Sequence, residues 1–493
     1  MNSDNPSRRE MLKSSAAMFA FATTGGFMAA PQAAQAALVT DPKPLQIPAL
    51  DSGRMQDGVR VYDLEIQAGT TSFFDDTNTE TLGINGSFLG PVLRMSTGDT
   101  VRMNVTNNLR ENTTLHWHGF TLPAAADGGP HQQIKPGAMW SPEFKVVNKA
   151  STMWYHSHQL HETAPQVWAG LAGLILIDDD ASTGLDLPST YGVDDIPVVL
   201  QDREFTRSGQ MPYAPSMHSR MMGLTGNIPM VNGTVWPYFD VTTRLVRLRL
   251  LNGSNGSIYT MAFSDGRSFD QVASDGGLLS APAQMRALRL APGERAEIVV
   301  DMSNSGSVML QSVASAGGGM MGGGMMGGGG PAFDFLELRP AGVLAESPQL
   351  PARLADLPAA SAQGVSKVRT FELQMSGMGP FAKFRINGQS MKMSRINETV
   401  EKGVDEIWEV SNASPMAHPF HIHNTQFRIL DRNGGAPEAG EQGLKDTVLV
   451  NPDERVRILI RFDHYSDPDA PYMYHCHILE HEDAGMMGQF TVV

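Results

Sequence analysis

One sequence unit occurs three times along this chain of 493 residues. Its copies are INGSFLGPVLRMSTGDTVRMNVTN (84–107), VNGTVWPYFDVTTRLVRLRLLN (231–252) and INGQSMKMSRINETVEKGVDEIWEVSN (386–412). Each copy begins with an Asn-Gly turn and ends with an alternating strand that stops at an Asn. Short Val-rich strands are punctuated by 50 Gly and 31 Pro. A unit that recurs in this way predicts three β-sandwich domains.

The copies divide the chain into three expected domains, at residues 45–180, 190–340 and 366–493. A link rich in Pro, Ala and Ser separates the last two, around residues 340–366. Helical periodicity is scarce, so we expect an all-β fold. A second recurring element, a turn followed by alternation, supports this division; it occurs as KPGAMWSPEFKV, APGERAEIVVDM and NPDERVRILIRF.

Residues 1–36 are typical of an export signal. Arg8-Arg9 precede a weakly apolar stretch, and Ala34-Gln35-Ala36 matches a small-x-small cleavage pattern. The arginine pair favours export by the twin-arginine machinery over an ordinary secretory route. No segment has the roughly 18 apolar residues needed to cross a bilayer. We therefore expect a periplasmic protein without membrane insertion.

Charge and cysteine content restrict the partners. The formal net charge of −15 argues against nucleic acid and anionic membranes, and is compatible with cations as substrates. The single cysteine, Cys476, forms no disulfide within the chain, so an exported protein needs another reason to keep it. We expect a monomer.

Eight of the 14 histidines form four His-x-His pairs. Two pairs follow Asn107 and Asn412 by nine and eleven residues, whereas the same offsets from Asn252 lead to Met261 and Phe263. The middle domain is therefore expected to hold no metal ligands. Alternate strand residues face one side, roughly 6.6 Å apart, so each pair offers two imidazoles to one cavity. Eight such nitrogens suffice for a three-metal cluster between the first and third domains; they belong to His116, His118, His156, His158, His421, His423, His475 and His477.

Cys476 lies between His475 and His477 but points to the opposite face of the same strand. Its predicted partners are His481, Met486 and His418. A thiolate, two imidazoles and a distant thioether form a trigonal blue-copper set, whereas the competing metal zinc prefers four strong ligands. The thiol would then join two metal sites.

The chain resembles the multicopper oxidases in the motifs HWHGF (116–120), DGGPHQQIKPG (127–137), WYHSH (154–158), HPFHIH (418–423) and HCHILEHEDAGMM (475–487). The resemblance implies three cupredoxin-like Greek-key β-sandwich domains and four copper ions. It implies a type 1 copper at His418, Cys476, His481 and axial Met486, a type 2 copper at His116 and His421, and a type 3 pair at His118, His156, His158, His423, His475 and His477. Members of this family pass electrons from a reductant at type 1 copper to O₂, which becomes water.

Two acidic residues, Asp127 and Glu482, match those that serve proton delivery in the family. Orientation of the ligands or of their water is the alternative role.

The substrate is indicated by methionines. The run GGGMMGGGMMGGGG (317–330) carries four thioethers between two expected strands, and thioethers select Cu(I). The resemblance is to cuprous oxidases of the copper-efflux type, which also oxidise phenols. The stretch at 371–386 is shorter than the Met-rich insert of those enzymes, and Ser414 replaces their acidic residue. A laccase acting mainly on phenols and a non-catalytic periplasmic copper-binding protein therefore remain alternatives. The complete ligand set argues against a third class, a structural homologue of the division-protein kind, because such homologues lose ligands.

Overall fold

The three sequence copies fold into equivalent local structures in the computed structural model, which describes residues 41–303, 306–314, 330–377 and 379–493. The first Asn of each copy adopts a left-handed conformation, with φ between 52° and 54°, as its Asn-Gly turn requires. The Asn that ends each copy donates from its side-chain amide to two main-chain carbonyls, one in the following loop and one far along the chain; these bonds belong to Asn107, Asn252 and Asn412. The repeated Asn thus stops the strand by tying its end to the neighbouring segments.

The first pair of sheets follows the first copy. One sheet has the order β10-β7-β4-β3, with β5 on β4 and β9 on β7, and the other has the order β2-β6-β12-β11-β8. The strands are β2 (Leu50–Asp51), β3 (Arg54–Gln56), β4 (Val59–Thr71), β5 (Thr79–Ile84), β6 (Val92–Ser96), β7 (Thr100–Asn107), β8 (His116–His118), β9 (Met139–Trp140), β10 (Glu143–Lys145), β11 (Ser151–His156) and β12 (Ala172–Asp178).

The middle pair has the orders β1-β16-β24-β23-β18-β21 and β15-β14-β13-β17-β22-β19-β20. The strands are β1 (Lys43–Pro44), β13 (Asp195–Arg203), β14 (Ile228–Val231), β15 (Thr234–Val235), β16 (Pro237–Thr243), β17 (Leu245–Asn252), β18 (Tyr259–Phe263), β19 (Phe269–Ser274), β20 (Gly277–Met285), β21 (Leu288–Leu290), β22 (Arg295–Asp301), β23 (Val308–Ser312) and β24 (Phe333–Ala345). β1, just before the expected first domain, pairs in parallel with β16.

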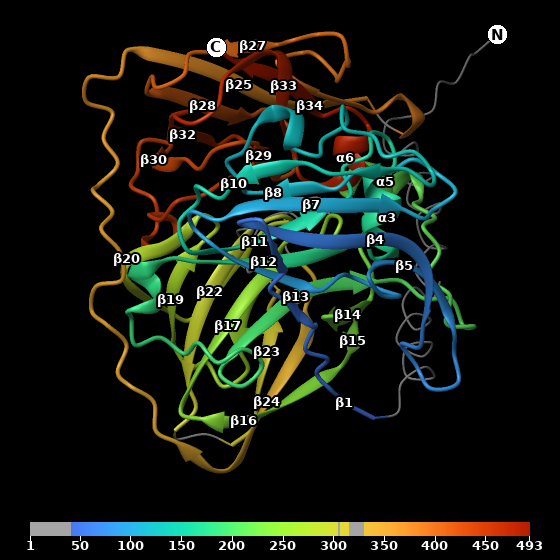
Figure 1. Cartoon of the computed structure of the whole chain (residues 1–493), viewed down its shortest axis with the longest axis vertical. Coiled ribbons are helices and arrows are strands. Elements are labelled where there is room, and N and C mark those ends of the chain that lie inside the picture. The colour runs from blue at the N-terminus through green and yellow to red at the C-terminus, as the bar shows by residue number, and fades with distance from the viewer. Residues whose placement is uncertain (1–40, 304–305, 315–329, 378) are drawn as a thin grey trace, which may run out of the picture. The chain divides into compact units, whose positions relative to one another are not determined.

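The third pair has the orders β26-β25-β28-β32-β30 and β27-β34-β33-β29-β31. The strands are β25 (Lys367–Ser376), β26 (Lys383–Ile386), β27 (Glu398–Val400), β28 (Glu406–Asn412), β29 (His418–Ile422), β30 (Arg428–Arg432), β31 (Thr447–Val450), β32 (Arg455–Ile460), β33 (Asp467–Cys476) and β34 (Met487–Val492). In Figure 1 the third pair lies at the top and the middle pair at the bottom, with strands of the first pair between them.

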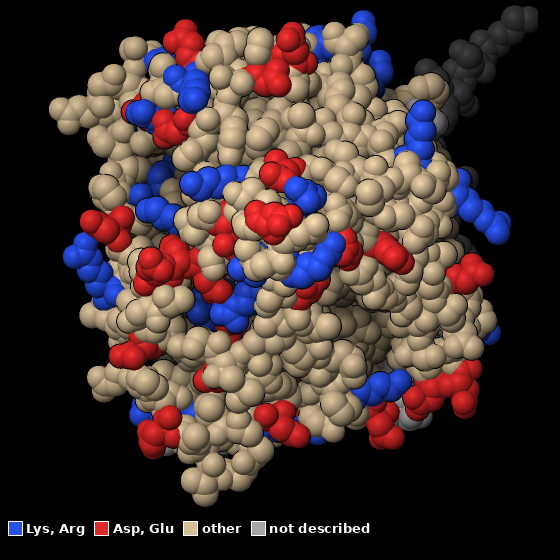
Figure 2. Space-filling view, in the orientation of Figure 1, with Lys and Arg blue, Asp and Glu red and all other residues tan. Residues whose placement is uncertain are grey.

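Each pair encloses its own apolar core, to which both of its sheets contribute buried side chains. Short helices connect the strands: α3 (Thr163–Ala169), α4 (Asp180–Thr183), α5 (Met217–Met222), α6 (Leu479–Asp483), and the 3₁₀ turns η1 (Ala124–Ala126), η2 (Gly379–Phe381) and η3 (Ala439–Glu441). The prediction of an all-β fold is confirmed. On the face shown in Figure 2, acidic and basic side chains are intermixed.

Two predictions concern residues outside the described part of the chain: the export signal at residues 1–36, and residues 317–329 of the Gly- and Met-rich run. The strands that flank this run, β23 and β24, pair antiparallel. Within the described residues, every helix is too short or too polar to cross a membrane.

Candidate metal centre

The four histidine pairs lie on four strands of two different sheets or, for the second members His158, His423 and His477, just past the strand ends. In the first pair of sheets, β8 and β11 set His116 opposite His156. In the third pair, β29 and β33 set His421 opposite His475. All eight side chains are at most 1% exposed. The structure therefore brings together the eight histidines that the sequence predicts.

Rings from the first pair of sheets stack on rings from the third. His116 lies on His423 with ring centroids 3.9 Å apart, and His118 lies on His421 at 3.7 Å. Four groups of possible ligand atoms result, each with its atoms within 4.8 Å of one another: His116, His118 and His156; His116, His421 and His423; His158, His423 and His475; and His118, His421 and Asp446.

Three of these imidazoles have one ring nitrogen in a hydrogen bond and the other ring nitrogen without a partner. Their Nδ1 atoms face main-chain carbonyls and donate to them, at 2.8 Å for His116, 2.7 Å for His156 and 2.9 Å for His421. Their Nε2 atoms are buried without a hydrogen-bond partner in the described structure. A buried, unpartnered imidazole nitrogen with its lone pair exposed to a shared space is a ready metal ligand. The donor set therefore fits metal ions.

Carboxylates orient the other converging rings. Asp127 Oδ2 accepts from His423 Nδ1 at 2.7 Å, and the two oxygens of Glu482 lie 3.2 Å from the Nδ1 atoms of His158 and His475. The Nε2 atom of His475 then lies 3.3 Å from that of His158 and 3.2 Å from that of His423. Both predicted acidic residues thus contact the rings of candidate ligands directly.

His118 and His477 differ from the others. His118 turns its Nε2 to Asp446 Oδ1 at 3.0 Å and leaves its Nδ1 without a partner. Both ring nitrogens of His477 are buried and unpartnered, and its ring centroid lies 5.0 Å from that of His118.

Burial lowers the pKa of all eight imidazoles, to about 3 for His156 and about 4 for His475. The rings are neutral at neutral pH, and neutral imidazole is the form that binds metals. Burial also raises the pKa of Asp127 and of Glu482 well above the ordinary carboxyl value.

A second donor group lies around the thiol. Cys476 Sγ is 3.4 Å from His418 Nδ1 and 3.6 Å from His481 Nδ1, and all three residues are buried. Met486 is also fully buried, in the apolar core cluster that contains Cys476. Its N–H donates to the carbonyl of His481. Burial raises the pKa of the Cys476 thiol, so metal binding would have to displace its proton.

The outer nitrogens of this group have partners. Ser414 Oγ accepts from His418 Nε2 at 2.6 Å, and the carbonyl of Met221 in α5 accepts from His481 Nε2 at 2.9 Å. Phe384 stacks on His481, with ring centroids 4.3 Å apart. These contacts leave both Nδ1 atoms directed at the sulfur. The Met221 contact comes from the middle segment of the chain, which is expected from the sequence to hold no metal ligands.

Sequence reasoning missed Asp446. Its carboxylate contacts His118, and its main-chain carbonyl accepts from His421 Nδ1 at 2.9 Å. The only local signal is its position just before β31, because it belongs to none of the His-x-His or Cys motifs. The four other histidines, His131, His161, His218 and His464, lie in none of the donor groups found among the described residues.

Comparison with known proteins decides the family. Residues 65–182 and 364–493 match two multicopper oxidase domain families. The chain is 35% identical over 446 residues to the multicopper oxidase mco of Staphylococcus epidermidis, covering 90% of each chain. This chain belongs to the multicopper oxidase family. The resemblance seen in the motifs is thereby confirmed.

Two further proteins are similar to this chain over most of its length. A solved structure of the bacterial laccase-like multicopper oxidase CueO, from the lignin-degrading Ochrobactrum sp., is 37% identical with a TM-score of 0.83. The match covers 91% of this chain and 100% of that chain. The cell division protein FtsP of Photorhabdus laumondii is 36% identical and covers 87% of this chain and 89% of its own. The cupredoxin-like fold is confirmed, and family membership makes the protein a copper oxidoreductase that uses O₂ and a reductant.

Proposed function

We propose that this oxidase couples one-electron oxidation of Cu(I), of phenols or of both to the four-electron reduction of O₂ to water. We assign four copper ions to it: type 1 at the Cys476 group, and type 2 and the type 3 pair at the eight histidines. Copper held by these donors would supply the one-electron redox chemistry. We further propose a periplasmic protein, exported by the twin-arginine machinery, with a role in copper tolerance.

The observation that carries this proposal is the position of Cys476. Its sulfur belongs to one donor group, while the residues on either side of it belong to the other. Electrons would have a short covalent path along β33 between the two. A protein that only stored copper would not need this connection.

The acidic residues are placed for two tasks. Asp127 accepts a hydrogen bond from His423 Nδ1, and the oxygens of Glu482 lie 3.2 Å from the Nδ1 atoms of His158 and His475. Carboxylates in these positions would favour ring orientations in which the Nε2 atoms converge. Oxygen reduction also consumes four protons. The carboxyl groups of Asp127 and Glu482 lie against ligand rings, so they are placed to supply these protons. We assign both orientation and proton delivery to them.

Methionines around the Cys476 group favour Cu(I) as the reductant. Met221 contacts His481 through its carbonyl and accepts a hydrogen bond from Gly379 N through its sulfur at 3.4 Å. Met222 and Met375 pack half-buried against the third core, and Met416 lies two residues before His418. Thioethers in such positions suit a soft cuprous ion.

Phenols are the second candidate. The neutral Ser414 hydroxyl contacts His418, at the position where the cuprous oxidases that the chain resembles carry an acid. A neutral group there is less suited to attract a cation. The CueO relative is described as acting on lignin model compounds, which is consistent with phenol oxidation by this chain as well.

Steady-state O₂ uptake by the copper-loaded protein tests the proposal, with Cu(I) and a dimethoxyphenol as alternative reductants. Faster uptake with Cu(I), reduced in Met221→Leu but not in the exposed Met55→Leu control, supports cuprous oxidation. Faster uptake with the phenol, unchanged in both variants, supports a laccase. No uptake with either reductant would leave a copper-binding or structural protein.

The Gly- and Met-rich run gives a separate test. Deletion of residues 317–330 is expected to slow Cu(I) oxidation more than phenol oxidation, because the four thioethers would capture the cuprous ion. Equal effects on both substrates would contradict a role in capture.

A further inference from the structure

The middle pair of sheets contributes a buried arginine to the surroundings of the histidines. Arg295, the first residue of β22, is fully buried. Its guanidinium group binds both carboxylate oxygens of Asp446, with Nη1 to Oδ1 at 2.7 Å and Nη2 to Oδ2 at 2.5 Å. The two residues are separated by 151 positions in the chain and belong to different pairs of sheets.

All five N–H groups of this guanidinium are used. Besides the two bonds to Asp446, Nε donates to the carbonyl of Thr152 at 3.1 Å, Nη1 to that of Gly293 at 2.9 Å and Nη2 to that of Asp275 at 3.0 Å. Thr152 belongs to β11, whose last residue is His156. Because the planar fork is fully occupied, it is held in one orientation relative to all three pairs of sheets.

Asp446 passes this constraint on to two histidines. Its Oδ1 lies 3.0 Å from His118 Nε2, and its carbonyl accepts from His421 Nδ1 at 2.9 Å. With His118 Nε2 occupied in this way, the free Nδ1 is the nitrogen left for a metal. The carboxylate thus selects which nitrogen of His118 is available.

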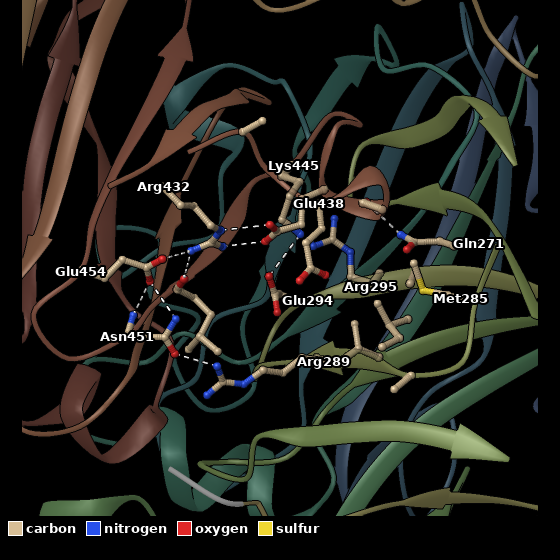
Figure 3. Close-up of a pocket in the computed structure, with 18 residues that line it drawn as sticks. Gln271, Met285, Arg289, Glu294, Arg295, Arg432, Glu438, Lys445, Asn451 and Glu454 are labelled. Carbon is tan, nitrogen blue, oxygen red and sulfur yellow. Dashed lines mark hydrogen bonds and ion pairs between the residues drawn. The ribbon is translucent and has the colours of Figure 1, made fainter. Parts of the chain in front are cut away.

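Besides its bonds to Asp446, Arg295 lines a cavity. Arg295 and Lys445 line a cavity of about 390 Å³ between β20, β21 and η3, together with Glu294 and Glu438 (Figure 3). Asp446 does not line this cavity and is fully buried. A shorter side chain at position 295 would therefore admit water to the carboxylate and loosen its contact with His118.

We propose that Arg295 is a positioning residue for the reduction of O₂, acting through Asp446 on His118 and His421. The middle domain, whose described residues appear in none of the donor groups, thus helps to set the geometry of the histidine centre. This inference rests on the proposed assignment of copper to the eight histidines.

The test uses copper-loaded Arg295→Gln and separates the two donor groups. Anaerobic bleaching of the blue absorbance by a reductant should stay within about twofold of wild type, because the Cys476 group is untouched. Reoxidation of the reduced protein by O₂ should slow by roughly 10–100-fold, and the EPR hyperfine splitting of the copper at the histidines should change. Arg295→Lys, which keeps the charge but not the fork, should recover part of the rate. Wild-type reoxidation and EPR spectra in Arg295→Gln would overturn the proposal.

Arg249→Gln is the matched control. Arg249 is another buried arginine of the middle domain, paired through two nitrogens with Asp195 and bonded to Thr152 Oγ1, but it contacts no histidine. Its replacement should lower stability and leave reoxidation and the EPR spectrum unchanged. An equal oxygen defect in Arg249→Gln would show general loosening instead and overturn the inference.

A second variant and a readout without turnover complete the test. If Arg295→Gln fails to fold, Asp446→Asn takes its place, because it keeps the shape of the side chain that Arg295 binds. Its EPR spectrum should differ from that of wild type, and an unaltered spectrum would contradict the proposal. The EPR comparison requires no turnover. The wild-type protein could therefore prove inactive while its EPR spectrum still changes in Arg295→Gln. That result would refute the proposed function and leave the positioning of the histidines by Arg295 supported.

Discussion

His475 and Cys476 are adjacent residues of β33 whose side chains belong to different donor groups. His475 Nε2 lies 3.2 Å from His423 Nε2, whereas Cys476 Sγ lies 3.4 Å from His418 Nδ1. Successive side chains of a strand point to opposite faces, so one peptide unit places a sulfur on one side and an imidazole on the other. The connection between the two groups is therefore built into the strand.

Replacement of this thiol should separate the two groups functionally. In Cys476→Ser the hydroxyl cannot provide a thiolate, so the intense blue absorbance and turnover should both be lost. The histidine centre contains no atom of the Cys476 side chain and should keep its copper. Absorption spectra and metal analysis check this outcome, and a blue, active variant would refute the assignment of Cys476.

The hydroxyl of Ser414 should support copper binding through His418. Ser414→Ala leaves the Nε2–H of a buried imidazole without its acceptor at 2.6 Å. We expect copper affinity at the Cys476 group to fall by roughly 10–100-fold, measured by competition with a chelator.

Ser254→Ala provides the control for that variant. Ser254 lies two residues after the second sequence copy, as Ser414 lies two residues after the third. The N–H and hydroxyl of Ser254 both contact Asn252 Oδ1, as those of Ser414 contact Asn412 Oδ1. Its replacement removes the same turn contact without affecting a histidine, so copper affinity should not change. A comparable loss in both variants would mean that the turn, and not His418, is responsible.

Gly293 is required by its contact with His477. Its φ is +85°, and a Cβ added there would lie 2.9 Å from the His477 ring. Gly293→Ala should therefore displace this ring and lower the copper content of the histidine centre, in addition to a backbone cost of about 1–2 kcal/mol. Gly434 has a similar φ of +83° and open space around it, so Gly434→Ala should show the backbone cost alone. Equal copper contents would contradict the proposed contact.

Glu297 should make stability depend on pH. Burial by itself would raise its pKa, but Arg247 and Arg249 outweigh burial and lower the pKa to about 2, from 4.5. A carboxyl with a lowered folded-state pKa adds stability above its unfolded pKa and loses it as pH falls toward the folded value. Glu297→Gln should therefore cost about 3 kcal/mol near pH 5 and about half of that near pH 3.

Urea unfolding of the copper-free protein at several pH values measures this difference without a contribution from metal loss. Glu143→Gln, which breaks the exposed pair with Arg102, is the control and should change stability little at any pH. A cost of Glu297→Gln that does not vary between pH 5 and pH 3 would rule out the ionised network.

The sequence by itself determined the features that depend on local spacing. Alternation along a strand places His116 with His118 on one face, and it sends Cys476 to the face opposite that of His475. The Asn residues that begin and end each copy make equivalent hydrogen bonds in all three copies, so the repeat could be recognised before the sheets were known. These features follow from neighbours in the chain and from the geometry of a single strand.

Only the tertiary structure decided which groups surround those donors. Asp446 reaches His118 across 328 positions, Arg295 reaches Asp446 across 151, and Met221 reaches His481 across 260. Asp446, Arg295 and Met221 lie in none of the metal-binding motifs, and Arg295 and Met221 come from the middle domain, which is expected from the sequence to hold no metal ligands. Their contacts depend on how three separately formed sandwiches pack together, and the pattern within a single strand carries no information about that packing.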